Sequence, residues 1–447
     1  MTNNSTKTFI NGKIFTGRNE NDFVSAMKVE NGKIVWTGDD PDRSGKVIDL
    51  RSSTILPGLI DNHTQPKYSA DALNGAACTP PFVNSIKDMQ EALRRTPEYG
   101  ENPETWIEGW GFDETKLAEH RSPTRDDLDK VSTKQPIFLY RSDCHSSVGN
   151  SKALKLAGID ENTPDPVGGK IEKDENGRPT GFMREVAASQ LLIRAKSELS
   201  YENDVKNLVD SSKHYLANGL VAIGEMMGRL HPYTTLQLYK DAAKKGFMPK
   251  TAIYYVAAEL DRNGELDRDT SDSNHLRVAG LKVFMDGSIS GETAWVKGGF
   301  LSGKKGICLT SREQMEKIVD YARKNKLQVA IHAMGDRAIQ LVLDITSNLT
   351  PWLKDRPSVR IEHASLLSDE MLEQIRTAKI GYGLSIQPIF FFAEEESYRD
   401  FLSPEQLSLC YRIKSAKEAC PLVSLSSDAP CTPWAEPDSP FYSIYAC

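Results

Sequence analysis

From about residue 200 onward, the chain alternates between two patterns of apolar residues. Stretches with helical apolar spacing, such as 203–218 and 233–245, end at a glycine and are followed by a short continuous apolar run. This order of helix and then strand predicts a parallel sheet, and its repetition favours a closed (β/α)8 barrel of the TIM type. The predicted barrel strands are 55–60, 220–225, 251–256, 276–284, 327–333, 359–363, 380–386 and 422–426. Further helices are predicted at 311–325, 336–349, 368–378 and 405–418.

The first 57 residues have a different pattern, in which short apolar runs alternate with turn residues. Asn11-Gly12 and Asn31-Gly32 are pairs that accept the positive φ angles of a tight hairpin turn. They predict two hairpins in a small antiparallel, β-sandwich-like domain over residues 1–57. Its predicted strands are 7–10, 13–15, 26–30, 33–37 and 47–49.

About 150 residues separate the first predicted barrel strand from the second. They include a helical pattern at 85–95, the Trp-rich stretch WIEGWGF at 106–112 and an apolar run at 136–140. Such a segment is too long for an ordinary loop between a strand and a helix. We therefore expect a barrel domain over 58–447 with an inserted subdomain at about 66–200, which lies over the mouth formed by the carboxyl ends of the strands.

The composition argues against several classes of protein. With 55 Lys and Arg against 62 Asp and Glu, the net charge is −7, and no long basic run is present to bind a nucleic acid. No run approaches the roughly 18 apolar residues of a membrane span, and the polar start of the chain lacks the apolar core of a signal peptide. The seven cysteines are scattered without a CxxC pair, which favours a reducing compartment. We expect a cytoplasmic protein whose partner is a small molecule.

Several predicted strands end in residues that can bind a metal ion. The first strand runs into His63, and the fifth and sixth strands end at His332 and His363. The fourth strand contains Lys282, and the eighth is followed by Asp428. Imidazole nitrogens and carboxylate oxygens are common zinc ligands, and a carboxylate can also accept a proton from bound water. Because the carboxyl ends of barrel strands meet at one mouth, we expect these side chains to converge.

Each of these residues alone has an ordinary explanation. A single histidine after an apolar strand is more often a core or surface residue than a ligand. Asp428 could cap the start of a helix, and Lys282 could extend its ammonium group to solvent. Together, however, the histidines, the aspartate and the lysine come from separate strands, which chance rarely supplies. The joint pattern therefore favours a metal site.

The segments around these residues occur in an order that is typical of a known family. They are ILPGLIDNH (55–63), HSSVGNSKALKLAGI (145–159), GKIEKDENGRPTGFMRE (169–185), GLKVFMDGS (280–288), IHAMGDRAI (331–339), RIEHASLL (360–367), SIQP (385–388) and SSDAP (426–430). Through them the chain resembles the amidohydrolase superfamily, specifically its large family-3 branch of metal-dependent C–N hydrolases. The resemblance implies a distorted (β/α)8 barrel, a small β-sandwich and a metal centre that activates water.

The resemblance also implies a role for each residue at a strand end. In such proteins the lysine of the fourth strand can be carboxylated and bridge two metal ions, and Lys282 matches that position. His332 and His363 match the histidine ligands of the fifth and sixth strands. Asp428 matches the aspartate that usually acts as general base, which takes the proton of the attacking water and delivers it to the leaving nitrogen.

The chain departs from the family at the first strand, where the usual His-x-His is His63-Thr64-Gln65. The amide oxygen of Gln65 is a poorer zinc ligand than an imidazole nitrogen. In the two-metal scheme, the first-strand pair and Asp428 hold one ion, whereas the residues of the fourth, fifth and sixth strands hold the other. The substitution therefore weakens only the first site. We expect a divalent metal, zinc for preference, at one site rather than two.

Five further residues in these segments are candidate substrate contacts: His145, Trp110, Asp286, Arg337 and Gln387. His145 is implied to contact the substrate carbonyl or the tetrahedral oxyanion, and the alternative is a histidine of a surface loop. For the other four, a place in the core, a turn or a salt bridge is the alternative. Glu185 could also face the site, although exposure on a helix face is its default interpretation.

The sequence thus predicts a metal-dependent hydrolase of a non-peptide, amide-like C–N bond in a small molecule. The alternative is a catalytically impaired amidohydrolase-like protein that binds or scaffolds, and Gln65 favours this alternative. Neither GxGxxG nor GxSxG occurs, so a dinucleotide-binding protein and a serine hydrolase have no support. The substrate is not identified, and a homo-oligomer stays open. Only about 19 residues follow Asp428, so we expect the small domain to lack the strands that the family adds from its C-terminus.

Overall fold

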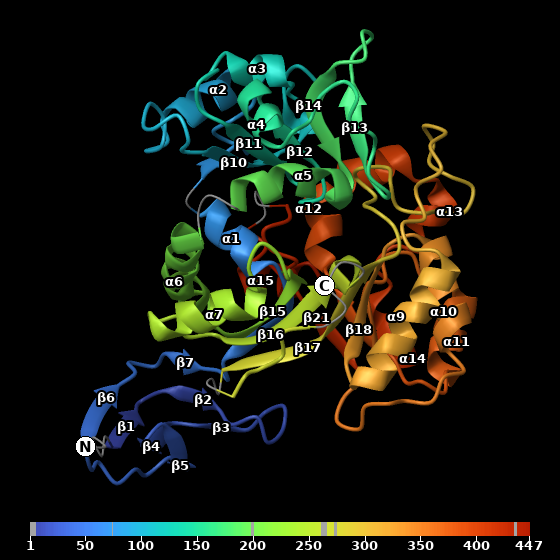
Figure 1. Cartoon of the computed structure of the whole chain (residues 1–447). Helices are drawn as coiled ribbons and strands as arrows, with labels where there is room; N and C mark the ends of the chain where they lie inside the picture. The colour runs from blue at the N-terminus through green and yellow to red at the C-terminus, as the bar shows by residue number, and fades with distance from the viewer. Residues whose placement is uncertain (1–5, 74, 198–200, 261–265, 272–274, 433–435) are drawn as a thin grey trace. The chain divides into compact units, whose positions relative to one another are not determined.

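The computed structural model describes residues 6–73, 75–197, 201–260, 266–271, 275–432 and 436–447. The chain divides into two compact units, Met1–Leu59 and Ile60–Cys447 (Figure 1). Within the described residues, no helix combines the length and the hydrophobicity needed to cross a lipid bilayer.

The N-terminal unit consists of two small sheets. Its strands are β1 (Thr6–Ile10), β2 (Lys13–Phe15), β3 (Phe23–Val24), β4 (Ala26–Glu30), β5 (Lys33–Gly38), β6 (Lys46–Asp49) and β7 (Thr54–Ile55). One sheet has the order β5-β4-β1-β6 and the other the order β3-β2-β7. Both are mixed and not antiparallel as predicted, because β1 pairs in parallel with β6 and β2 pairs in parallel with β7.

The two Asn-Gly pairs of this unit behave differently. Asn31 and Gly32 have φ angles of 50° and 77° and connect β4 to β5 in the predicted antiparallel hairpin. At the other pair, Asn11 has a positive φ of 56°, whereas Gly12 does not. A tight hairpin turn of this type needs both, so the chain instead leaves β1 and enters β2 in the other sheet. The first predicted hairpin is therefore wrong.

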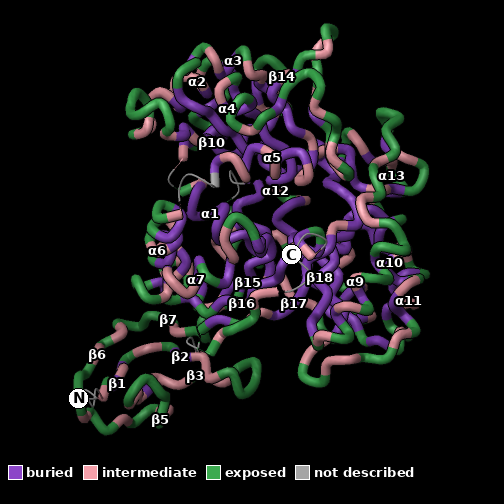
Figure 2. The backbone as a smooth tube through the Cα atoms, viewed as in Figure 1, coloured by how far each residue is buried: buried purple, intermediate pink, exposed green. Residues whose placement is uncertain are grey.

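The second unit is built on an eight-stranded sheet with the order β21-β20-β19-β18-β17-β16-β15-β8. Its strands are β8 (Leu59–Thr64), β15 (Leu220–Gly228), β16 (Lys250–Val256), β17 (Leu276–Phe284), β18 (Gln328–Ala333), β19 (Val359–His363), β20 (Gly383–Ile386) and β21 (Val423–Leu425). From β15 to β21 each strand is parallel to its neighbour, and most of their residues are buried (Figure 2). This is the predicted (β/α)8 architecture.

The first barrel strand starts later than predicted. Thr54–Ile55 form β7 of the N-terminal unit, so the barrel strand covers 59–64 and not 55–60. Both segments belong to one apolar run in the sequence, and the pattern does not show where that run divides. As a consequence, His63 lies within the strand and not after it.

Backbone hydrogen bonds join the end of β8 to the loop that follows β21. The Asp428 N–H donates to the His63 carbonyl, and the Gln65 N–H donates to the Ala429 carbonyl, both at 2.8 Å. These bonds bring the ends of the first and the eighth barrel strands together. They also fix the backbone of three predicted site residues.

The helices around the barrel are α6 (Tyr201–Ala217), α7 (Thr235–Lys244), α9 (Arg312–Asn325), α10 (Asp336–Thr346), α11 (Asp369–Thr377) and α14 (Ile413–Ala419). The start of α9 is typical, because the Ser311 hydroxyl accepts a hydrogen bond from the Gln314 N–H. The predicted helix over 405–418 is wrong: α13 (Pro404–Leu407) and α14 are separate, and Tyr411 between them has a φ of 45°. The helices α12 (Pro388–Phe401) and α15 (Pro440–Tyr445) are not predicted.

The segment between β8 and β15 forms a six-stranded sheet of its own, with the order β13-β14-β12-β11-β10-β9. Its strands are β9 (Ala76–Ala77), β10 (Ile107–Phe112), β11 (Ile137–Arg141), β12 (Ser147–Gly149), β13 (Lys170–Lys173) and β14 (Pro179–Arg184). Its helices are α1 (Pro66–Ala72), α2 (Ile86–Arg94), α3 (Arg125–Asp129), α4 (Ser151–Leu156) and α5 (Glu185–Ser197). The Thr432 N–H donates to the Ser142 carbonyl at 2.9 Å, so this insertion contacts the loop after β21.

Candidate metal centre

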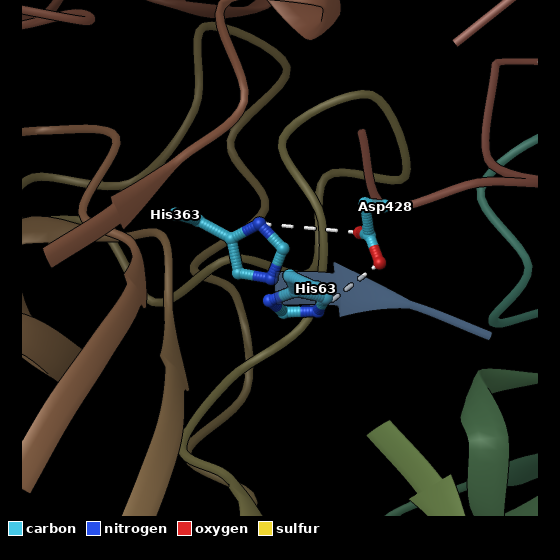
Figure 3. Close-up of side chains that lie close together, drawn as sticks. All are labelled: His63, His363 and Asp428. Carbon is cyan, nitrogen blue, oxygen red and sulfur yellow. Dashed lines mark ion pairs between the residues drawn. The ribbon is translucent and has the colours of Figure 1, made fainter. Parts of the chain in front are cut away.

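His63, His363 and Asp428 converge at the carboxyl ends of three barrel strands (Figure 3). One carboxylate oxygen of Asp428 lies 3.1 Å from His63 Nε2, and the other lies 4.0 Å from His363 Nδ1. One possible ligand atom from each residue lies within 4.8 Å of the other two, and all three side chains are buried. Residues from three separate strand ends, between 65 and 365 positions apart in the sequence, therefore form one compact polar cluster.

The chemistry of this cluster fits a divalent cation. Two imidazole nitrogens and one carboxylate are a ligand set typical of zinc. His363 Nδ1 is buried and has no hydrogen-bond partner, so it is free to bind an ion. Burial and the positive charges of His63 and Lys282 hold the pKa of His363 well below its usual range, which keeps the ring neutral. A neutral imidazole is the form that binds a metal.

Asp428 is held in its ionised form. Burial would raise its pKa, but the nearby His63, through its charge and its hydrogen bond, outweighs burial and the pKa lies below the usual value. Gln65 Nε2 also donates a hydrogen bond to Asp428 Oδ1. An ionised carboxylate in this place can bind a cation or accept a proton.

Glu362 orients His63 from behind, a role that the sequence does not predict. Glu362 Oε2 lies 2.5 Å from His63 Nδ1, and its other carboxylate oxygen accepts a hydrogen bond from Arg360. Burial would raise the pKa of Glu362, but the positive charges of Arg360 and His63 lower it to about 2. A carboxylate on one ring nitrogen leaves the other nitrogen available to an ion. The signal in the sequence is a pair of charged residues, Arg360 and Glu362, within the short strand VRIEH, all of whose residues are buried.

Lys282 and His332 lie beside the cluster. Lys282 Nζ is 3.0 Å from His63 Nε2, and burial lowers the pKa of Lys282 to about 8. The ring of His332 lies 4.4 Å from that of His363, between centroids, and its Nε2 is 3.1 Å from the Gly287 carbonyl. Burial and the neighbouring His363 hold the pKa of His332 well below its usual range. All the predicted strand-end residues thus lie at one mouth of the barrel. The most compact group, however, combines His63 of the first predicted site with His363 of the second.

The amide of Gln65 turns its NH2 group, and not its oxygen, toward Asp428. The residue precedes α1, and its NH2 group donates to Asp428. Its Oε1 is buried and has no hydrogen-bond partner. The amide therefore holds the carboxylate and leaves one acceptor free.

His145 comes from the insertion and reaches the same place. Its ring centroid lies 5.2 Å from that of His332, and its Nδ1 lies 3.0 Å from Glu185 Oε2. Burial lowers the pKa of His145, but the hydrogen bond and charge of Glu185 outweigh burial and raise it. Glu185 is only 2% exposed, so the default interpretation of an exposed helix face is wrong. Glu185 is the first residue of α5 and directly follows β14, so it is buried where the strand meets the helix.

These residues surround a cavity whose other walls are mostly apolar. The residues that line it are His63, Gln65, Tyr68, Asp143, Cys144, His145, Val186, Met227, Lys282, Phe284, His332, His363, Asp428 and Cys431. Most of the apolar walls and both cysteines are absent from the sequence-based prediction. Some of them lie next to predicted residues in the chain, as Cys144 does to His145, and adjacency is a signal for these; Met227 has no predicted residue nearby in the sequence.

The other four candidate substrate contacts are not part of this lining. Asp286 accepts hydrogen bonds from the backbone N–H groups of Trp295, Met334 and Gly335, and burial raises its pKa to about 7. The Arg337 guanidinium lies 4.4 Å from the ring centroid of Trp295. Both contacts hold the loops after β17 and β18 together.

Gln387 and Trp110 also have structural contacts. Gln387 Nε2 donates to Ser426 Oγ at 2.8 Å, next to the start of the loop that carries Asp428. The Trp110 ring packs on Tyr140, with centroids 4.4 Å apart, and it touches Tyr68, which does line the cavity. Trp110 therefore supports the wall of the cavity from behind.

Comparison with known proteins agrees with this geometry. Residues 46–446 match the model of a family described as the amidohydrolase family. An N-substituted formamide deformylase of Arthrobacter pascens is 29% identical over 443 residues, which are 94% of this chain and 80% of that protein. A putative amidohydrolase, YtcJ of Bacillus subtilis, is 29% identical over 441 residues, with the same coverage of 94% and 80%.

Solved structures give the same result. An uncharacterized metal-dependent hydrolase from Pyrococcus horikoshii superposes with a TM-score of 0.77 at 26% identity, over 99% of this chain and 86% of that one. A second, from Pyrococcus furiosus, has a TM-score of 0.74 at 26% identity, over 99% and 88%. The family match over nearly the whole chain, together with the barrel and its strand-end cluster, leads to one conclusion. The chain belongs to the amidohydrolase family.

Proposed function

We propose that this protein is a metal-dependent hydrolase that cleaves a non-peptide, amide-like C–N bond in a small molecule. The observation that carries the proposal is the buried group His63, His363 and Asp428, whose possible ligand atoms lie within 4.8 Å of one another. The name of one relative, N-substituted formamide deformylase, supports an N-substituted formamide or a similar simple amide as the substrate class.

The charges around the cavity support a neutral substrate. Apart from histidines, Lys282 is the one basic residue among the described residues of the lining, and it lies against His63. No arginine of the described lining is placed to hold a carboxylate of the substrate. The apolar side chains Val186, Met227 and Phe284 suit an uncharged substituent.

His63, His363 and Asp428 would hold the metal ion. When bound there, such an ion would supply the chemistry of a Lewis acid, which makes water a better nucleophile and polarises a carbonyl. Lys282 and His332, with a shared His363, are the proposed ligands of a second ion, and a carboxylated Lys282 is part of that proposal. Burial lowers the pKa of Lys282 to about 8, which favours the neutral amine that carboxylation requires.

Two residues move or hold protons in the proposed reaction. Asp428 accepts the proton of the attacking water and delivers it to the leaving nitrogen, while Gln65 holds the carboxylate in place. His145 donates a hydrogen bond to the oxygen on which negative charge develops. Glu185 favours this role because its hydrogen bond and charge outweigh burial and raise the pKa of His145.

The experiment measures metal content and hydrolysis in protein purified without chelator. A panel of N-substituted formamides and acetamides is incubated with the protein before and after zinc or manganese is added. We expect about one ion per chain, and a loss of that ion in His63→Ala and His363→Ala. Asp428→Asn should lower the hydrolysis rate by about 10²-fold or more, whereas Asp355→Asn, an exposed aspartate, should not change it.

The alternative of an impaired binding or scaffold protein predicts a different outcome. In that case the folded protein contains well under about a tenth of an ion per chain, and added zinc or manganese produces no hydrolysis of any panel member. This result would exclude the proposed hydrolase.

A further inference from the structure

Two cysteines lie in the wall of the proposed substrate cavity. Cys144 belongs to the insertion, between Asp143 and His145, and Cys431 follows Asp428 by three residues. Both are buried, with exposed fractions of 8% and 3%, and both belong to the same apolar cluster. Segments nearly 300 residues apart in the sequence thus bring two thiols to one surface of the cavity.

The contacts around the two thiols hold them together. The two thiols lie close enough to influence each other's pKa, and burial raises the pKa of both. Cys431 Sγ also donates to the Asp143 carbonyl at 3.4 Å, and the Thr432 N–H donates to the Ser142 carbonyl at 2.9 Å. The loop of Cys144 and the loop of Cys431 are therefore fixed side by side by backbone and side-chain bonds.

The other cysteines differ from this pair. Cys308 and Cys447 are exposed, and Cys78 lies in the separate core of the insertion. Cys420 Sγ donates to the Tyr382 carbonyl, and Cys410 Sγ donates to the Gln406 carbonyl. Among the described residues, the group whose ligand atoms could hold a metal contains no cysteine, so the pair has no third ligand close by. Two adjacent thiols without a third ligand favour sulfur–sulfur chemistry over a metal site.

We propose that Cys144 and Cys431 form a dithiol modification site in the cavity wall, which a peroxide oxidises to a disulfide. One thiol attacks a peroxide oxygen, the O–O bond breaks, and a sulfenic acid forms as one water leaves. The second thiol then displaces the sulfenic hydroxyl as a second water, which leaves the S–S bond. The two sulfurs are oxidised, and the peroxide is reduced to water.

The disulfide covalently links the loop of His145 to the loop of Asp428. In the reduced protein these loops are joined by hydrogen bonds and apolar packing, without a covalent bond between them. The cross-link limits the movement of the two loops relative to each other. It also removes the two free thiols that face the cavity. We expect the oxidised protein to lose hydrolase activity and a thiol reductant to restore it.

The first test maps the cross-link without any substrate, so its result does not depend on the proposed hydrolase. The full chain with Cys308→Ser and Cys447→Ser, which removes the two exposed thiols, is treated with hydrogen peroxide, digested without reductant and analysed by mass spectrometry. We expect one cross-linked peptide pair that contains Cys144 and Cys431, and its disappearance after dithiothreitol. Cross-links that join other cysteines, or oxidation without any cross-link, would overturn the proposal.

The second test uses phenylarsine oxide, a trivalent arsenical that forms two As–S bonds with neighbouring thiols and releases one water. We expect one tightly held arsenical per chain of the same Cys308→Ser/Cys447→Ser protein. Cys144→Ser or Cys431→Ser in that protein should weaken retention at least about tenfold, because one thiol alone lacks the second bond. Cys420→Ser, which changes a buried cysteine elsewhere, serves as the matched control and should retain the arsenical. Equal retention in all variants would contradict the paired site.

Discussion

His363 and Asp428 share an uncommon backbone conformation at the mouth of the barrel. Their φ angles are 68° and 56°, in the left-handed region that residues with a β-carbon rarely adopt. Such a conformation costs about 1–3 kcal/mol and persists where the surrounding structure fixes it. Here the surroundings are the strand ends themselves, including the bond from the Asp428 N–H to the His63 carbonyl. Two of the proposed metal ligands thus have a strained backbone conformation.

Gln65 stands at the position where the family usually has the second histidine of its first-strand pair, and we propose that it limits metal binding. We expect Gln65→His to increase the metal content of purified protein, because an imidazole nitrogen is a better zinc ligand than an amide oxygen. Hydrolysis of the formamide panel should increase in parallel. Elemental analysis of protein purified without chelator measures the first effect.

Gln65→Leu is the control for this prediction. It also removes the hydrogen bond to Asp428 but supplies no ligand atom, so it should not increase the metal content. An unchanged metal content in Gln65→His would count against Gln65 as part of the first site.

Helix α1 connects the first barrel strand to the insertion through buried charges. Lys67 Nζ lies 2.6 Å from Asp71 of the same helix and 2.8 Å from Asp204 of α6. Lys196 of α5 lies 3.3 Å from the same Asp71. These side chains are at most 7% exposed. Since α1 starts directly after Gln65, this network holds the element that carries one side of the site.

Lys67→Met should therefore destabilise the protein by about 3 kcal/mol, because it leaves buried carboxylates without one of their cations. Lys206→Met on α6 is the matched control. Its ion pair with Asp210 is exposed, so its loss should cost less than about 0.5 kcal/mol. Urea unfolding of the two variants measures the difference. Similar midpoints would show that the buried network contributes no more than an exposed pair.

The barrel elements could be predicted because periodicity reports burial directly. Helices such as α9 have an apolar face and a clear cap, and both features are local in sequence. The errors occur where tertiary context decides. Asn11-Gly12 has the residues of a tight turn, yet its strands pair with other partners. Residues 405–418 have helical spacing, yet Tyr411 interrupts the helix with a positive φ.

The candidate site could be predicted in part for a similar reason. His63, His363 and Asp428 each follow from a position at the carboxyl end of a barrel strand, which topology brings together. Glu362 and the cysteines of the cavity wall do not follow from position, because their roles depend on how side chains pack between segments distant in the sequence. Cys144 and Cys431 reach the wall of one cavity only where the insertion meets the loop beyond β21.

At the scale of the whole molecule, one buried carboxyl group couples stability to pH. Glu394 lies at a kink in α12 and is 7% exposed. Burial and the negative charge of Asp113 raise its pKa to about 8. The folded protein therefore keeps a proton that the unfolded chain releases above its ordinary pKa of 4.5. By linkage, the free energy of unfolding falls as the pH rises from the unfolded value through the folded one.

Glu394→Gln should remove this dependence, because glutamine stays neutral at every pH. Between about pH 5 and about pH 8, we expect the wild-type protein to lose up to about 4 kcal/mol more stability than the variant. Glu395→Gln, which changes the exposed neighbour that pairs with Arg399, should behave like the wild type. Urea unfolding at both pH values measures the effect. Parallel curves for wild type and Glu394→Gln would contradict the assignment.

The hydrogen bonds between β8 and the loop after β21 join the first barrel strand to the last, and the candidate metal centre lies beside them. Opening the barrel between these two strands breaks the bond from the Asp428 N–H to the His63 carbonyl and separates two of the proposed ligands. Local opening of the barrel and release of the ion are then one event. An ion at about 100 times its dissociation constant should slow hydrogen exchange at the Asp428 and Gln65 amides by about 100-fold. The Leu50 amide, which donates to the Ile10 carbonyl in the N-terminal unit, should exchange at an unchanged rate. The ion would then stabilise the closed barrel as well as serve the proposed reaction.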